Sequence, residues 1–482
     1  MLFNSLHFLA FFPIVTLLYF LLPAGQRWLV LLVASFYFYM VWRPAFVLLI
    51  LLTVTIDYVA AMLLVRTASP GRRKLLLASS ITANMGILAY FKYTNFALDS
   101  VRAASDAMGL GWTIPVYDII LPIGISFHTF QSVGYAIDVY RGVLRPEHRY
   151  PRFALFVMFF PQLVAGPIER APRLLTQLQK PTEFDYDRAA EGIKRIVWGM
   201  FKKVVIADRL AGYVNVVYGD PARFDGVALT VATYFFAFQI YADFSAYSDI
   251  ALGSARVLGF DLMENFRRPY FARSVEEFWR RWHISLSTWF RDYLYIPLGG
   301  NRLGGWRTHV NIFIVFLISG LWHGSNWTYV VWGALHGTWI VAGRLAQRIP
   351  WQVTAPAWAQ RVWTFHLALL AWVFFRIGSV GEGIDLLVRA ATDVPRFVAS
   401  LPGVRDFYDA AIAPVLITPF DFATAVALVG FLLAVEWGME QGWFAGSRRA
   451  RPWLERLWYD GLAVGCLLLG VFGKHEFIYF QF

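Results

Sequence analysis

Apolar runs recur along the whole chain, and short polar or basic stretches separate them. The first run, residues 6–22, has no basic residue before it and no small-residue cleavage site after it. It is therefore predicted to be a membrane span rather than a cleaved signal peptide. Further spans are predicted over residues 28–42, 45–65, 75–96, 119–140, 153–164, 228–241, 309–322, 327–342, 362–375, 423–437 and 457–472.

Basic residues between these runs indicate an orientation. Residues 66–74 form the first basic loop, and basic loops prefer the cytoplasmic side. This places the N-terminus outside. Residues 448–456 carry four arginines before the last run, so the last span is predicted to enter from the cytoplasm and the tail to emerge outside. In a bacterium this describes a multi-pass inner-membrane protein with periplasmic N- and C-termini.

Two apolar runs carry an unusual number of polar groups. Residues 119–140 contain Pro122, Gly124 and Gly134 together with Ser126, His128, Gln131 and Asp138. Broken, polar backbone at membrane depth is tolerated where it is buried in protein or lines a cavity. A kinked span and a cavity wall both fit this pattern. The second run, residues 228–241, leads to the tunnel-lining candidates Gln239, Asp243 and Ser245. Trp322 and Asn326 are further tunnel-lining candidates.

Three stretches do not fit the span pattern. Residues 170–204 alternate basic and apolar positions, which predicts an amphipathic helix on the inner membrane surface. Residues 265–307 carry eight arginines among aromatic side chains, which favours short helices dipping into the interface. Residues 378–418 are mixed and are predicted to be a loop with short helices.

Composition agrees with a membrane protein. Of the 482 residues, 58% are hydrophobic and 16% are charged, against about 25% charged in soluble proteins. We expect one membrane domain over residues 1–482, with residues 457–482 as its final span and outward-facing tail. The net charge of +11 is explained by lipid-facing loops, so no nucleic acid partner is expected. The single cysteine, Cys466, allows neither an internal disulfide nor a cysteine metal site.

Two Trp-His pairs, Trp282-His283 and Trp322-His323, are the strongest candidates for chemistry. A buried histidine stays neutral and can accept a proton from a hydroxyl group. Arginine binds phosphate with two parallel hydrogen bonds, so nearby arginines suit a phosphate-bearing donor. The donor-binding candidates are Arg267, Arg268, Arg280, Arg281, Arg291 and Arg302.

Other interpretations of these residues stay open. By pattern alone His323 is better explained as a packed membrane-helix histidine than as a base, and His336 as a residue that packs or supports the site. His283, Ser287 and Asp292 form a Ser-His-Asp set, but no G-x-S-x-G motif supports it. Residues 299–305 are glycine-rich but lack the Gly-Lys-Ser/Thr of a phosphate loop. No histidine spacing suggests zinc, so no metal is expected.

Several long blocks resemble the bacterial branch of the membrane-bound O-acyltransferase family, and within it the members that acetylate alginate. These blocks are ILPIGISFHTFQSVGYAIDVYRG, PQLVAGPIER, YADFSAYSDIA, MENFRRPY, FWRRWHISLSTWFRDYLYIPLGGNR and GLWHG. The resemblance implies an all-α polytopic membrane protein, a ring of about 11 to 12 tilted spans with short re-entrant helices around a central tunnel. It implies that His323 in GLWHG is the catalytic residue and that His283 is the second family position.

The resemblance also implies a reaction. Cytosolic acetyl-CoA is the expected donor, and His323 is expected to deprotonate an acceptor hydroxyl while His283 orients the acceptor or stabilises the oxyanion. The acetyl group is then expected to reach a periplasmic SGNH-like acetyltransferase or another polysaccharide-modifying partner, which acetylates an alginate-like exopolysaccharide. Acyltransfer to a lipid, cellulose or peptidoglycan remains an alternative. A transporter without chemistry is another, although no inverted repeat is visible.

The last six residues, FIYFQF, are similar to the end of a small membrane peptide that accompanies the teichoic-acid D-alanylating members of the family. There the tyrosine of the motif is proposed to carry the acyl group. The resemblance therefore makes Tyr479 a candidate acyl relay. An aromatic anchor at the membrane interface explains the same residues equally well.

Overall fold

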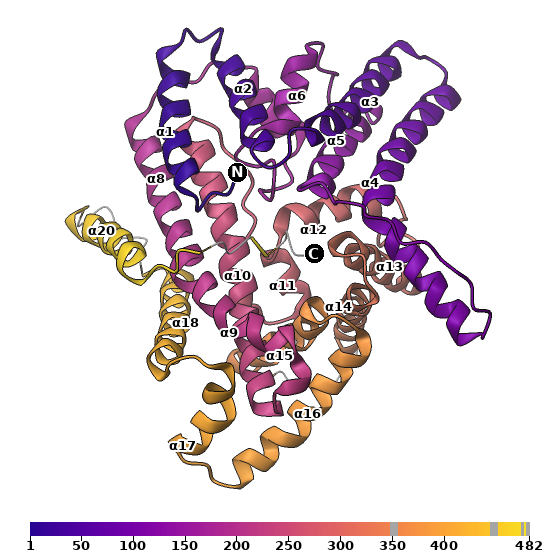
Figure 1. Ribbon diagram of the computed structural model, residues 1–482. Helices are drawn as coiled ribbons and strands as arrows, with labels where there is room; N and C mark the ends of the chain where they lie inside the picture. Colours follow the sequence, from indigo (N-terminus) through magenta and orange to yellow (C-terminus); the bar gives the residue numbers. More distant parts are fainter. Residues whose placement is uncertain (348–354, 444–451, 474–476, 479–482) are drawn as a thin grey trace.

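The computed structural model describes residues 1–347, 355–443, 452–473 and 477–478, and every regular element in these ranges is a helix. The predicted all-α class is confirmed. Long helices stand around a centre that holds two short helices, α11 (Val275–Arg281) and α12 (Ile284–Phe290) (Figure 1). The N-terminal amino group lies against α2 (Arg27–Met40), where it donates to the backbone oxygen of Phe38 at 3.0 Å.

The first half of the chain supplies the helices on one side of this centre. Local signals set their ends: Ser5 and Asp225 cap α1 and α10 through their side chains, and Pro70 begins α4. The elements are α1 (Leu6–Leu21), α2 (Arg27–Met40), α3 (Phe46–Arg66), α4 (Pro70–Ala107), α5 (Ile125–Tyr140), α6 (Tyr150–Met158), α7 (Ala171–Leu178), α8 (Tyr186–Met200), the π-helical η1 (Phe201–Ala207), α9 (Asp208–Gly219), η2 (Pro221–Arg223) and α10 (Gly226–Val257).

The second half closes the arrangement. Asn326 and Thr418 cap α14 and α18 in the same manner. Besides α11 and α12 the elements are η3 (Pro269–Phe271), η4 (Arg291–Tyr295), α13 (Gly305–His323), α14 (Trp327–Ala346), α15 (Ala357–Arg376), α16 (Val380–Ala399), α17 (Val404–Phe407), η5 (Tyr408–Ile412), η6 (Ala413–Val415), α18 (Pro419–Glu440) and α20 (Pro452–Leu469).

Four helices of the described chain are long and apolar enough to cross a membrane by length and composition: α3, α4, α10 and α18. Two shorter apolar helices, α1 and α2, accompany them. The four long helices differ in their surroundings, because α10 is largely buried inside the protein whereas α4 is largely exposed. The chain is a multi-pass membrane protein, with α10 as a central helix and α4 at the periphery.

The interrupted run at residues 119–140 becomes a helix only from Ile125 onward. Gly124, at the start of α5, has a φ of 76°, in the left-handed region that favours glycine. A Cβ atom there would also lie 2.9 Å from the backbone oxygen of Leu163. The preceding residues run without regular structure, and the prediction of a broken backbone is confirmed.

The expected surface helix at residues 170–204 is wrong in its position. α8 lies against α10, and two glycines of α8 let the backbones approach each other. A Cβ at Gly192 would lie 2.6 Å from the oxygen of Gly253, and a Cβ at Gly199 would lie 2.8 Å from that of Ala246. Lys202 and Lys203 follow α8 and are buried. Sequence pattern missed this because the charges that suggested an exposed face are neutralised inside the protein by acidic residues of α9 and α10.

The region 378–418 is more regular than expected. α16 is a continuous helix of 20 residues, although Pro395 stands inside it. It packs against α10, where Arg389 donates to the backbone oxygen of Phe224 and Asp393 accepts from the backbone nitrogen of Gly226. These tertiary contacts stabilise a helix that local composition does not specify.

Candidate active site

His323 is the last residue of α13, deep inside the protein. Its side chain is 3% exposed and packs among aromatic rings: Trp332 at 4.9 Å and Phe375 at 5.4 Å between ring centroids. Such surroundings exclude bulk water and favour the neutral imidazole. A neutral imidazole is the form that can accept a proton.

Two glycines of the sequence GLWHG let α14 approach the end of α13. A Cβ at Gly320 would lie 2.2 Å from the backbone oxygen of Tyr329, and a Cβ at Gly324 would lie 2.0 Å from the Tyr329 ring. Neither contact is possible for a larger residue without moving the backbone. The glycines on both sides of His323 therefore fix its place against α14.

His283 lies beside His323, as the sequence interpretation required. The centroids of the two imidazole rings are 6.2 Å apart, and His283 is fully buried. His283 precedes α12 with a φ of 44°, a left-handed conformation that costs a non-glycine residue about 1–3 kcal/mol. A backbone hydrogen bond from Ile284 to the oxygen of Asn265, 3.0 Å long, holds the chain in this turn.

Asn265 determines the tautomer of His283. Its Oδ1 accepts hydrogen bonds from the backbone nitrogen of Ser285 (3.3 Å) and from the Ser285 hydroxyl (2.9 Å), and its Nδ2 lies 3.2 Å from the hydroxyl of Ser248. The backbone N–H can only donate, so the amide orientation is fixed. Nδ1 of His283, 3.1 Å from Oδ1, must then carry the proton and donate. Nε2 is left as an acceptor with no partner among the described residues.

A cavity of about 560 Å³, here called the His323 cavity, reaches the catalytic candidate from one side. It is lined by the turn before α5, by the end of α13 and by one residue of α4. Its lining includes Lys92, Ser126, Trp322 and His323. Of the tunnel-lining candidates, Trp322 lies in this wall.

A second cavity of about 780 Å³, the arginine pocket, is lined by residues of α11, α12, α13 and α14. Its walls are mostly apolar, and Arg280, Arg291 and Arg344 stand at it. It includes Ser319 and Ser287, each one helical turn from a histidine: Ser319 precedes His323 on α13, and Ser287 follows His283 on α12. Neither histidine belongs to the wall of the arginine pocket, whereas His323 belongs to the wall of the His323 cavity.

The arginine pocket has a charged edge outside the membrane-spanning helices. Glu276 of α11 pairs with Arg280 (2.5 Å) and with Arg344 of α14 (3.1 Å). Burial alone would raise the pKa of Glu276, but the two guanidinium groups hold that pKa below its usual value. Arg344 was not among the sequence candidates, because it comes from another helix and only the fold brings it to this edge.

The six arginine candidates for donor binding fall into three pairs with different surroundings. Arg280 and Arg291 line the arginine pocket. Arg268 and Arg281 bind Glu440 of α18 at 2.6 and 3.0 Å, while the exposed Arg267 and Arg302 do not line either cavity. The geometry is therefore compatible with donor binding by Arg280 and Arg291 and gives Arg268 and Arg281 a structural contact instead.

Three polar tunnel candidates are engaged in structural contacts. Asp243 pairs with Lys203 at 2.8 Å, and the hydroxyl of Ser245 accepts from Lys202 at 2.7 Å. Asn326 caps α14 by accepting from the backbone of Thr328 at 3.1 Å. Gln239 is buried on the same helix as Asp243, and neither it nor Asn326 lines the His323 cavity.

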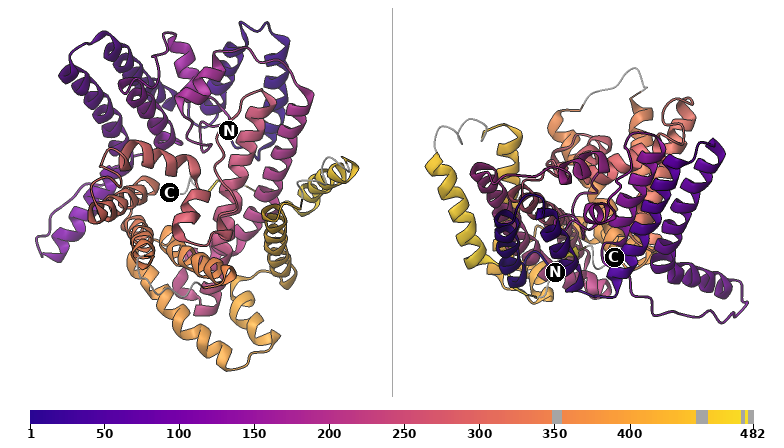
Figure 2. Two further views of the ribbon diagram at one scale, coloured as in Figure 1. Left: turned by 180° about the vertical axis from the view of Figure 1, so that it is seen from behind. Right: turned by 90° about the horizontal axis from the view of Figure 1, so that it is seen from above.

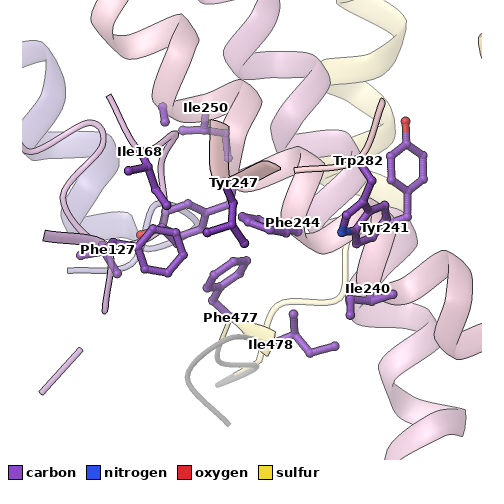
Figure 3. Packing of buried hydrophobic residues seen from close by; sticks show 14 of the residues in the cluster. Phe127, Ile168, Ile240, Tyr241, Phe244, Tyr247, Ile250, Trp282, Phe477 and Ile478 are labelled. Carbon is purple, nitrogen blue, oxygen red and sulfur yellow. The ribbon is translucent and has the colours of Figure 1, made fainter. Parts of the chain in front are cut away.

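Tyr479 lies outside the described residues, but its neighbours Phe477 and Ile478 are described. The ring of Phe477 lies 4.4 Å from Tyr247 and 5.8 Å from Phe244 (Figure 3). The backbone nitrogen of Ile478 donates to Asp243 at 2.8 Å. Phe244 in turn contacts His283, at 4.8 Å between centroids. The described end of the chain is therefore one aromatic ring away from His283.

The competing interpretations of the site can be compared with the geometry. Ser287 donates to the backbone oxygen of Trp282, and Asp292 pairs with Arg170 and Arg291, so these residues do not form a triad with His283. His336 accepts a hydrogen bond from Trp279 at 3.2 Å, a packing contact. Within the described ranges, no group of three His, Cys, Asp or Glu side chains is placed to hold a metal ion.

Known proteins are similar to this chain over most of its length. Residues 143–380 match the family model of the membrane-bound O-acyltransferase family. The chain is 43% identical over 399 residues to a probable alginate O-acetylase AlgI of Azotobacter vinelandii, covering 81% of this chain and 77% of the relative. It is 33% identical over 425 residues to a peptidoglycan O-acetyltransferase of Helicobacter pylori, covering 80% and 79%.

A third relative, a teichoic acid D-alanyltransferase of Bacillus subtilis, is 30% identical over 238 residues, covering 46% of this chain and 58% of the relative. The family match and these relatives, together with the bundle of apolar helices, define a membrane-embedded acyltransferase. The chain belongs to the membrane-bound O-acyltransferase family.

Proposed function

We propose that this protein is a membrane O-acetyltransferase that takes acetyl groups from cytosolic acetyl-CoA and delivers them across the bacterial inner membrane for O-acetylation of an alginate-like exopolysaccharide. The observation that carries the proposal is the buried pair His283 and His323, with ring centroids 6.2 Å apart and the His323 cavity at one of the two rings. The arginine pocket reaches other residues of the same two helices, Ser287 of α12 and Ser319 of α13. The alginate acceptor is inferred from relatives named alginate O-acetylase.

Contacts of the predicted loops support the direction of transfer. Arg73, in the loop expected to be cytoplasmic, donates to the oxygen of Tyr140, and the adjacent Arg141 donates to the oxygen of Asp292. Asp292 neighbours Arg291 of the arginine pocket. We therefore assign the arginine pocket to the cytosolic side, where Arg280, Arg291 and Arg344 suit the phosphates of acetyl-CoA.

The opposite assignment follows for the His323 cavity. Ile123 and Val164 are shared between it and a neighbouring cavity whose wall includes Met1. The N-terminus is expected to be periplasmic from the charge pattern. The His323 cavity then opens toward the periplasm, where a polysaccharide-modifying partner, such as an SGNH-like acetyltransferase, receives the acetyl group.

In the proposed reaction His323 accepts the proton of an acceptor hydroxyl, whose oxygen attacks the thioester carbonyl carbon. The tautomer set by Asn265 makes Nε2 of His283 an acceptor, so His283 suits orienting that hydroxyl. It does not suit stabilising the oxyanion, which needs a donor. Of the two roles expected for His283, we propose the first.

The test is His323→Ala in the purified full-length protein with acetyl-CoA as donor. The variant is expected to remain in the membrane at the normal level and to lose coenzyme A release by about 10²- to 10⁴-fold, the usual contribution of a general base. Release at the normal rate would refute the assignment of His323. Absence of coenzyme A release by the wild-type protein would instead favour the transporter interpretation.

Tyr479 is proposed as an acyl relay between the histidine pair and the periplasmic partner. Its support is the placement of Ile478, whose backbone nitrogen binds Asp243 beneath Phe244, the ring that contacts His283. A tyrosine hydroxyl needs a neighbouring base to act as a nucleophile, and His323 is the candidate.

A second candidate acceptor is peptidoglycan, because the Helicobacter pylori relative of that name is matched over 79% of its length. Mass spectrometry of both polymers from a deletion strain separates the two. Loss of acetyl groups from the exopolysaccharide supports the first candidate, and loss from the cell-wall sugar alone supports the second.

A further inference from the structure

The buried end of α13 is closed by two side chains of α4. The hydroxyl of Tyr93 donates to the oxygen of Leu321 at 2.6 Å, and Nζ of Lys92 donates to the oxygens of Trp322 (2.5 Å) and His323 (3.1 Å). The last carbonyl groups of a helix have no partner within the helix, and inside a protein they need donors from elsewhere. Lys92 and Tyr93 supply those donors at the catalytic end of α13.

Lys92 is an unusual choice for this task. Its side chain is 8% exposed, and none of the ion pairs found in the described ranges includes it. An unpaired ammonium group at membrane depth is costly, and such residues generally mark a functional site. Tyr93 closes the neighbouring carbonyl without any charge, so closing the helix does not by itself require a lysine.

The charge of Lys92 stands at the His323 cavity. An ammonium group has three N–H donors, and the two carbonyl oxygens of α13 use two of them. Lys92 lines the same cavity as His323, with Nζ 5.9 Å from the centre of the Trp322 ring. The described part of the chain offers no further acceptor to Nζ, so the third N–H is available to a group in the cavity.

We propose that Lys92 is a catalytic residue that binds the oxyanion formed during acyl transfer; this rests on the proposed function. The acceptor oxygen gives its proton to His323 and bonds to the thioester carbonyl carbon, and the carbonyl electron pair moves onto oxygen. The third N–H of Lys92 donates to that oxygen. When the C=O bond re-forms, the C–S bond breaks and the thiolate takes the proton from His323. The negative charge that develops on the oxygen favours the ammonium form of Lys92, which gives up no proton in either step.

This role is one that neither histidine fills. Nε2 of His283 is an acceptor because Nδ1 donates to Asn265, and His323 must be unprotonated to act as a base. An oxyanion in a water-excluded site is stabilised most by a fixed donor, and a charged donor is stronger than a neutral one. Lys92 is held in place by two carbonyl groups before the reaction begins.

The experiment compares Lys92→Met with Tyr93→Phe in the full-length protein, using acetyl-CoA as donor and coenzyme A release as readout. Lys92→Met removes the cation but keeps the length of the side chain. It is expected to lower kcat by about 10²- to 10³-fold with KM for acetyl-CoA within about threefold, as for loss of an oxyanion donor. Tyr93→Phe removes a donor from the same helix end and is expected to keep kcat within about threefold.

An equal loss of kcat in both variants would overturn the proposal, because it would show that closing α13 is the whole role. If the Lys92→Met protein does not accumulate, the same measurement is made on Lys92→Gln, which keeps a neutral donor. A wild-type kcat in Lys92→Gln would overturn the proposal. Lys92→Arg is expected to recover at least about tenfold over Lys92→Met. His323→Ala separates failure of the proposed function from failure of the proposed role of Lys92. Normal coenzyme A release by His323→Ala would overturn the proposed function. Normal release by Lys92→Met, with loss of release by His323→Ala, would overturn the role of Lys92 alone.

Discussion

The side-chain oxygen of Asn265 lies 3.1 Å from Nδ1 of His283, and this contact decides which nitrogen of the histidine is free to act. Asn265 comes from the segment before η3, and the same oxygen receives two hydrogen bonds from Ser285 at the start of α12. One amide therefore fixes the tautomer of His283 and the turn on which His283 stands.

Asn265→Ala is expected to lower kcat by about 10- to 100-fold, less than the loss of a general base, because His283 remains but its tautomer is no longer imposed. Asn265→Asp keeps the oxygen that accepts from Nδ1 and is expected to keep more activity than Asn265→Ala. Coenzyme A release from acetyl-CoA measures both. Equal activity of the two variants would argue against the tautomer explanation.

Arg344→Ala and Arg291→Ala are expected to raise KM for acetyl-CoA by about tenfold each, because each guanidinium stands at the arginine pocket and a charge-assisted hydrogen bond is worth about 1.5–3 kcal/mol. The exposed Arg302, which does not line this pocket, provides the control, and Arg302→Ala is expected to leave KM unchanged. Steady-state kinetics at two salt concentrations checks this. A similar KM increase in all three variants would indicate general attraction by surface charge.

Tyr479→Phe is expected to abolish acetylation of the polymer in cells while leaving the protein level unchanged, because the ring remains but the hydroxyl that would carry the acetyl group is lost. Tyr459→Phe, in α20 of the same final segment, is the matched control and is expected to acetylate normally. The acetyl content of the isolated polymer is the measurement. Wild-type acetylation by Tyr479→Phe would leave the aromatic anchor as the role of this residue.

Asp243→Ala is expected to destabilise the protein by about 3–5 kcal/mol, because it leaves Lys203 with one of its two buried carboxylate partners and removes the acceptor for Ile478. Thermal unfolding of the detergent-solubilised protein measures the effect. Asp460→Ala, at an exposed position of α20, is the control and is expected to stay within about 0.5 kcal/mol of wild type. Unchanged stability of Asp243→Ala would make this residue a genuine candidate for the tunnel wall.

Much of the helical architecture could be predicted from the sequence, because apolar runs and breaker residues act locally. The run at residues 45–65 corresponds to α3. Gly124, which has a left-handed φ, stands where the irregular segment ends and α5 begins. The two Trp-His pairs, which the sequence singled out, lie next to each other in the fold. Their convergence at 6.2 Å depends on α13 and α12 meeting in space, which no spacing along the chain encodes.

The residues that complete the site were missed for the same reason. Asn265 is an ordinary polar residue until Ser285 and His283 lie against it, and Arg344 belongs to a helix end far along the chain. Lys92 did leave a signal, a single basic residue inside an apolar run. Lys202 and Lys203 misled the interpretation, since their acidic partners on α9 and α10 are visible only in the fold.

The length of α4 links the catalytic centre to the lipid around it. The helix has 38 residues, about 57 Å, against a hydrocarbon core of roughly 30 Å, and its far end projects beyond the other helices (Figure 2). A helix that long adjusts its tilt when bilayer thickness changes. Tyr93 attaches it to the backbone oxygen of Leu321, and Lys92 attaches it to those of Trp322 and His323. Turnover is therefore expected to vary with the acyl-chain length of the surrounding phospholipids, which would make membrane composition a regulator of polymer acetylation.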